Sequence, residues 1–167
     1  SPPIPGSPAA EVLDALRGPD DDKFFKLVQL LAEEGGWPAL EPFLEAAADP
    51  DPGMRRRGIY ALGHHHQDEA VRQRLGESLA DRDSVVRLAA LTAVGRHAVR
   101  ELAGEVGRLF LLEGQDPQLA KAAAEALSKL ADPSSVDALE AAKARFPTFV
   151  VRSACDMALR RIAAAGR

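Results

Sequence analysis

Hydrophobic positions recur at helical spacing through most of the chain, and polar turn-forming residues interrupt them at regular intervals. After Asp83, apolar side chains fall three or four residues apart, at Val86, Ala90, Ala93 and Val94. That spacing places them on one face of a helix. The aspartate before them is a favoured N-cap, because its carboxylate accepts hydrogen bonds from unpaired backbone N–H groups. The pattern therefore predicts a capped helix with one buried face.

The same capped helix recurs along the chain. Three copies align without gaps, at residues 51–63, 83–95 and 116–128, and their starts are 32 and 33 residues apart. A fourth copy covers 151–159, and a fainter first copy begins at Asp22. A period in the low thirties is typical of a helix–turn–helix repeat.

A second helix is predicted before each capped one, at about residues 9–16, 38–48, 68–80, 99–112 and 133–145. Turns rich in Gly, Pro and Asp separate the helices, as turn chemistry requires. Pro42 must lie in the first turn of its helix, because deeper in the helix it would remove a backbone hydrogen bond. The sequence thus predicts an all-α chain of about ten helices, with no sheet.

The stretch from Trp37 to Gly63 resembles a HEAT repeat, of the short kind named after phycobilisome lyases. The resemblance extends over about residues 9–165 and implies a right-handed α-solenoid of about five HEAT-like helical hairpins. In that family the second helix of each hairpin lines the concave face. We expect residues 9–167 to form this domain, and residues 1–8, which include four prolines, to be a linker or a cloning remnant.

The resemblance also implies a ladder in which an aspartate and an arginine from successive repeats interact. The aspartates at the matching positions are Asp51, Asp83 and Asp116. The arginines at the matching positions are Arg55, Arg87 and Arg152. Because Ala120 stands at the arginine position of one repeat, one pair of the ladder should be missing there.

Removing the core positions from the capped helices leaves side chains predicted to line the concave face and contact a partner. They are Phe24, Arg56, Arg57, Tyr60, Leu88, Thr92, Arg96, Lys121, Lys129, Met157 and Arg161. Arg96, Lys129 and Arg161 fall in one row across successive repeats, while the chain as a whole has a net charge of −4. A basic row on an acidic chain favours an anionic partner, although a row of charges is also typical of a plain solvated face.

Composition narrows the function classes. Nucleic-acid-binding domains usually carry a basic excess, so the net charge of −4 argues against that role. The single cysteine, Cys155, excludes an intrachain disulfide and fits the reducing cytoplasm. No apolar run approaches the roughly 18 residues that span a membrane. Aromatic residues make up only 5%, so Ala, Leu and Val must form most of the core.

The conspicuous triplet His64-His65-His66 invites a metal interpretation, which would need about three converging ligands. His97, at the equivalent position of the next repeat, lies a full helix spacing away, so packed or solvated histidines are the favoured interpretation. Deoxyhypusine hydroxylases are HEAT-like and bind iron through His-Glu pairs, but no His-Glu dipeptide occurs in this sequence. HEAT-like DNA glycosylases have basic, aromatic-bearing concave faces, whereas this chain is acidic overall and Trp37 falls before an outer helix. We therefore expect no metal or cofactor.

The favoured interpretation is a non-catalytic interaction module or scaffold that binds an acidic peptide or protein surface in its concave groove. Phe24, Tyr60, Leu88 and Met157 would be its apolar anchors. The alternative is an enzyme or lyase-like HEAT protein that holds a small anionic ligand in the same groove, although no catalytic residues are recognisable. Nucleic-acid binding is the least favoured alternative. We expect a cytoplasmic protein without a membrane partner.

Overall fold

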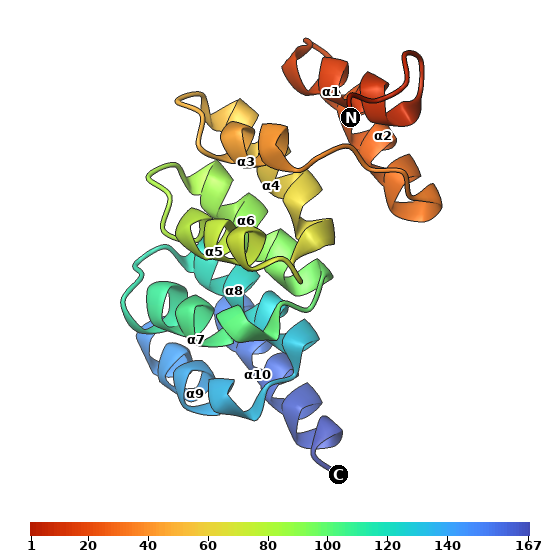
Figure 1. Cartoon of the computed structure of the whole chain (residues 1–167). Coiled ribbons are helices and arrows are strands. Elements are labelled where there is room, and N and C mark those ends of the chain that lie inside the picture. The colour runs from red at the N-terminus through yellow and green to blue at the C-terminus, as the bar shows by residue number, and fades with distance from the viewer. The chain divides into compact units, whose positions relative to one another are not determined.

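The computed structural model describes all 167 residues, which form ten α-helices and no β-strand (Figure 1). The helices are α1 Pro8–Arg17, α2 Asp21–Glu34, α3 Glu41–Ala47, α4 Pro52–Leu62, α5 Glu69–Ser78, α6 Ser84–Arg96, α7 Ala103–Val106, α8 Pro117–Leu130, α9 Val136–Arg145 and α10 Phe149–Ala165. The predicted all-α class is confirmed, and the helices are consistent with an α-solenoid. The right-handed course and the linker at residues 1–8 stay predictions. The chain divides into two compact units, Ser1–Leu75 and Gly76–Arg167.

Aspartates begin four of the helices, three of them at the predicted residue. The N-caps of α2, α4, α6 and α8 are Asp20, Asp51, Asp83 and Asp116, and each carboxylate accepts a hydrogen bond from a backbone N–H two or three residues on. These bonds satisfy donors that the first turn of a helix otherwise leaves unpaired. In the first copy the cap is Asp20, whereas the sequence alignment had placed the start of that copy at Asp22.

The helices before the capped ones are less regular. The segment predicted as one helix at 99–112 consists of a 3-10 turn Arg100–Leu102, the short α7 and a π-helical turn Gly107–Leu112. Two glycines, Gly104 and Gly107, lower the helix propensity of this stretch. Pro42 lies in the first turn of α3, as its chemistry required.

Small residues let neighbouring helices approach closely. In the first unit, a Cβ atom on Gly58 of α4 would lie 2.5 Å from the backbone nitrogen of Ala47 and 2.7 Å from the carbonyl oxygen of Phe43, both in α3. In the second unit, Gly95 of α6 similarly faces Ala126 of α8. The helices therefore pack nearly backbone to backbone, and a larger residue at Gly58 would push them apart.

Candidate functional site

In the second unit, α6, α8 and α10 lie side by side, with α8 packed against both of its neighbours (Figure 1). Two adjoining hollows open on the exposed face of these helices and share Lys121, Glu125 and Val150. Residues near the starts of α8 and α10 line the first hollow, and residues further along both helices line the second. The two helices therefore run in the same direction across this face. We call it the inner face of the second unit.

The first hollow, of about 600 Å³, is mainly apolar. Leu88 and Val150 line it with 45% and 52% of their surfaces exposed. Its charged residues neutralise each other, because Lys121 Nζ lies 3.1 Å from Glu125 Oε1. This end of the face therefore presents apolar surface with little net charge.

The second hollow, of about 450 Å³, is basic. Lys129 and Arg161 line it and are exposed, and the single acidic lining residue, Glu125, already pairs with Lys121. Met157 lies in the same hollow with 58% of its surface exposed. The structure thus brings together four residues that the sequence predicted as partner contacts: Lys121, Lys129, Met157 and Arg161.

Three further predicted contacts lie on α6. Leu88, Thr92 and Arg96 are exposed at successive turns of this helix. The hydroxyl of Thr92 donates a hydrogen bond to the carbonyl oxygen of Leu88 at 2.9 Å. The predicted side chains of α6 are therefore accessible, and Leu88 reaches the first hollow.

In the first unit, the expectation that Phe24 and Arg57 are exposed is wrong. Phe24 is fully buried, and Arg57 is only 8% exposed. Counted from the N-caps, Arg56 lies five residues after Asp51, and the residue five after Asp20 is Phe25, so Phe25 rather than Phe24 takes the half-exposed position. Arg57 serves the fold instead. Its Nε lies 2.7 Å from Asp21 Oδ1, and its Nη1 donates to backbone carbonyl groups at the end of α1.

Arg56 and Tyr60 are half-buried in the same unit. The Arg56 guanidinium lies over the ring of Phe25, 5.2 Å from its centroid, and 3.7 Å from Asp21. The Tyr60 ring meets the Phe25 ring edge-on at 4.6 Å, and its hydroxyl accepts a hydrogen bond from Gln29 Nε2 at 3.2 Å. Both predicted contacts remain accessible, although aromatic and polar neighbours hold them in place.

The ladder arginines bind turn carbonyl groups. Arg55 Nη1 donates to the carbonyls of Asp49 and Pro50, each at 2.9 Å, and Arg87 Nη1 donates to the carbonyl of Asp81 at 2.8 Å.

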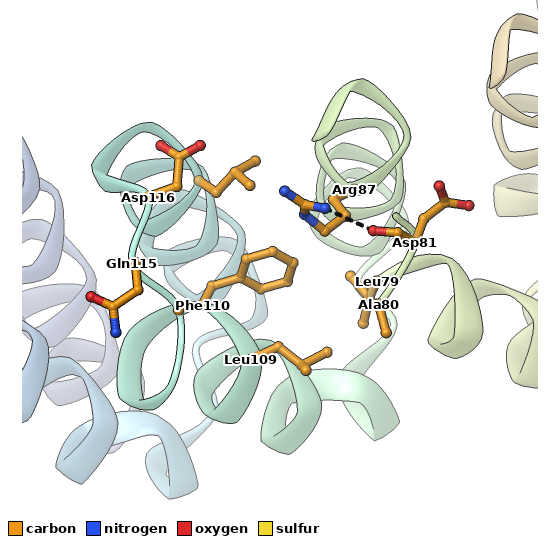
Figure 2. A pocket seen from close by; sticks show the side chains of 10 residues that line it. Leu79, Ala80, Asp81, Arg87, Leu109, Phe110, Gln115 and Asp116 are labelled. Carbon is orange, nitrogen blue, oxygen red and sulfur yellow. Dashed lines mark hydrogen bonds between the residues drawn. The ribbon is translucent and has the colours of Figure 1, made fainter. Parts of the chain in front are cut away.

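Figure 2 shows Arg87 and Asp116 on two sides of a pocket, with the Phe110 side chain between them and Leu109 below. The pocket has a volume of about 280 Å³. Arg87 therefore stabilises the turn of its own repeat, and the pocket separates it from the aspartate of the next one. Arg152, the last predicted ladder arginine, is exposed.

The histidine triplet is a packing element of the first unit. The His65 ring meets the Trp37 ring edge-on at 4.3 Å, and its Nε2 is buried without a hydrogen-bond partner. Burial lowers the pKa of His65, with Asp68 opposing that shift. No three or more His, Cys, Asp or Glu side chains are grouped so that they could hold a metal ion.

Cys155 is buried, and burial raises the pKa of its thiol to about 11. A thiol with so high a pKa is a poor nucleophile at neutral pH, because the thiolate is the reactive form.

None of the ten helices combines the length and apolar character needed to cross a lipid bilayer.

Sequence reasoning missed the apolar start of α10. Phe149 and Val150 are 83% and 52% exposed, and both line the second hollow. The repeat alignment began its last copy at Val151, which is buried. Three consecutive apolar residues at the start of a helix were the available signal, because a helix can bury only one face against its neighbours.

Comparisons with known proteins agree with this architecture. The family model for HEAT repeats matches residues 9–95 and again residues 73–160. A search of curated proteins gives no match. The solved structure of human deoxyhypusine hydroxylase in complex with glycerol is similar, with a TM-score of 0.64 and 22% sequence identity. The match covers 93% of this chain and 64% of the hydroxylase, so this chain spans less than two thirds of that protein.

At 22% identity, the likeness to the hydroxylase shows the fold alone. The HEAT-repeat model, by contrast, matches nearly the whole chain, in two overlapping segments. This chain therefore belongs to the HEAT-repeat family.

Proposed function

We propose that this chain is a non-catalytic interaction module or scaffold that binds an acidic peptide or protein surface on the inner face of the second unit. One observation carries the proposal: Lys129 and Arg161 are exposed together beside apolar side chains in one hollow of a chain whose net charge is −4. Cations of this kind steer an acidic partner towards the surface, and neighbouring apolar anchors retain it. Repeat proteins commonly present such extended surfaces.

Further residues extend the proposed contact. On α6, Thr92 and Arg96 are exposed beside Leu88. In the first unit, Arg56 and Tyr60 offer a second place where a partner segment can be held.

We also propose that the repeats are of the short phycobilisome-lyase-like type, supported by the spacing of 32 and 33 residues between copies. A cytoplasmic location is supported by the single, unpaired cysteine.

The test is charge reversal at the basic hollow. The variant Lys129→Glu/Arg161→Glu is compared with Lys23→Glu/Lys26→Glu, which changes the net charge equally at exposed positions of the first unit. The probe is fluorescein-labelled hexaglutamate, measured by fluorescence anisotropy at about 50 mM salt, where screening is weak. We expect the hollow variant to bind about tenfold more weakly than the control variant. Equal affinities of the two variants, with helical content intact, would refute the proposal.

The alternative is an enzyme or lyase-like protein that holds a small anionic ligand in the second hollow. Its volume of about 450 Å³ is in the range of small-molecule sites. Calorimetry with a tricarboxylate such as citrate tests this function. Citrate binding that is tighter than hexaglutamate binding, and that is lost in the Lys129→Glu/Arg161→Glu variant, would favour the alternative. A single-stranded oligonucleotide that outcompetes both would favour nucleic-acid binding.

A further inference from the structure

The inner face of the second unit is polarised along its helices. Of its exposed apolar side chains, Leu88, Phe149 and Val150 lie near the helix starts and Met157 lies at mid-face. Its unneutralised cations, Lys129 and Arg161, lie near the helix ends. Because α8 and α10 run in the same direction, the two ends of the face are chemically distinct.

The separation between these ends follows from helix geometry. Lys121, which lines both hollows, lies eight residues before Lys129 in α8, which corresponds to about 12 Å along the axis at 1.5 Å per residue. Val150 lies eleven residues before Arg161 in α10, which corresponds to about 16 Å. Glu125 lies between the two ends but pairs with Lys121, so it leaves the two cations uncompensated.

We propose that the segment that binds here is extended and equally polarised, with an apolar side chain about four to five residues from a cluster of carboxylates. An extended chain advances about 3.3 Å per residue, so that spacing spans the 12 to 16 Å between the two ends. This inference rests on the proposed function and specifies its ligand.

A helical partner fits the surface less well. A helix that docks on others buries a continuous apolar stripe along its length. Here the apolar surface extends from Phe149 and Val150 to Met157 at mid-face, and beyond it the lining residues are Lys129 and Arg161. An extended segment needs only one apolar anchor at one end and carboxylates at the other.

A peptide series tests the spacing. The probe is fluorescein-Leu-Leu-Gly-Ser-Gly-Ser-Glu-Glu-Glu, measured by anisotropy at about 50 mM salt. Three control peptides lack the Gly-Ser spacer, extend it to ten residues, or replace both leucines with serine. We expect the four-residue spacer to bind about fivefold or more tightly than the peptides without the spacer or without the leucines, because the first cannot place its glutamate cluster at the basic end and the second lacks the anchor. The ten-residue spacer reaches both ends at a lower effective concentration and should bind about threefold more weakly.

Two protein variants test which end of the inner face binds the leucines and which end binds the glutamates. Leu88→Ser/Val150→Ser, at exposed positions, should reduce binding of the leucine peptide to that of the serine peptide, and should leave the serine peptide unaffected. Lys129→Glu/Arg161→Glu should weaken both peptides relative to the Lys23→Glu/Lys26→Glu control.

Two failures have different meanings. If all acidic peptides bind equally, whatever their leucines or spacer, the polarised ligand is refuted while the acidic partner stands. If no peptide, hexaglutamate included, distinguishes the Lys129→Glu/Arg161→Glu variant from its control, the proposed function itself fails.

Discussion

Arg145 Nη2 donates a hydrogen bond to the carbonyl oxygen of Gly114 at 3.0 Å, and Gly114 lies six residues before Ala120. In the preceding repeat, Arg87 binds the carbonyl of Asp81, which also lies six residues before it. An arginine at position 120 would therefore be expected to bind Gly114. Arg145, from α9 of the next repeat, supplies that guanidinium instead, so the missing ladder arginine does not leave the turn unsupported.

In the first unit, too, an arginine from a later helix takes the place of a local one. Phe24 stands at the arginine position of the first repeat, and the carbonyl six residues before it belongs to Gly18. Arg57 of α4 donates to that carbonyl at 2.7 Å. Carbonyl groups at a helix end lack intrahelical partners, and leaving them buried without a hydrogen bond lowers the stability of the fold. An arginine from a later helix thus replaces the local one in both units.

The first prediction concerns Arg57. Arg57→Met keeps the apolar stem but removes the donors to Ala15, Leu16 and Gly18 and the partner of Asp21. We expect a loss of about 2–4 kcal/mol in the free energy of unfolding, because part-buried carbonyl groups lose their partners. Urea denaturation followed by fluorescence of Trp37, the single tryptophan, measures it in this unit. Arg56→Met, at a more exposed position, should cost under about 1 kcal/mol; equal losses would contradict the assignment.

The second prediction tests the replacement at Ala120. Arg145→Met should destabilise the second unit by about 1–3 kcal/mol, because the carbonyls of Leu111 and Gly114 lose their donor. Ala120→Arg alone should also destabilise it, because position 120 is buried and Arg145 already binds Gly114. In the Arg145→Met background, Ala120→Arg should lower the free energy of unfolding by less. A double-mutant cycle by thermal denaturation measures this coupling, and strictly additive losses would show that the two positions do not serve one turn.

The third prediction concerns pH. The unfolded pKa of His65 is 6.5, and burial lowers the native value. Below pH 6.5 the unfolded chain takes up a proton more readily than the fold does, so stability is full above pH 6.5 and falls as the pH decreases through the native pKa. His65→Phe should reduce this acid sensitivity while keeping an aromatic ring against Trp37. Urea denaturation by circular dichroism at pH 7.5 and 5.5 measures the effect, with His66→Gln as the control that retains it.

The fourth prediction concerns helix packing. Gly58→Ala should destabilise the first unit by about 3 kcal/mol, because the new Cβ would meet rigid backbone atoms of α3. Gly104→Ala, in a helix with no atom near the added Cβ, should instead be neutral or stabilise by up to about 1 kcal/mol. Thermal melts of the two variants give the comparison, and similar melting temperatures would contradict the close approach of α3 and α4.

Most of the helices, three of the aspartate caps and the repeat could be predicted from the sequence alone. An aspartate cap and a helical period depend on residues only a few positions apart, so Asp51, Asp83 and Asp116 could be recognised without the fold. The sequence also placed Lys121, Lys129, Met157 and Arg161 on one exposed face, because equivalent positions of stacked repeats point the same way. Where the first repeat was shifted by one residue, that logic failed, and Phe24 was wrongly predicted to be exposed.

Which arginine binds which turn, and where the exposed face changes from apolar to basic, depends on how the helices pack together. Arg57 and Arg145 reach carbonyl groups 39 and 31 residues away, and no local pattern encodes such a contact. Likewise, the apolar start of α10, at Phe149 and Val150, forms the two hollows only together with Leu88 and Lys121 on neighbouring helices. Contacts between segments distant in the chain depend on how helices pack, and packing is a property of the assembled fold rather than of any short stretch of sequence.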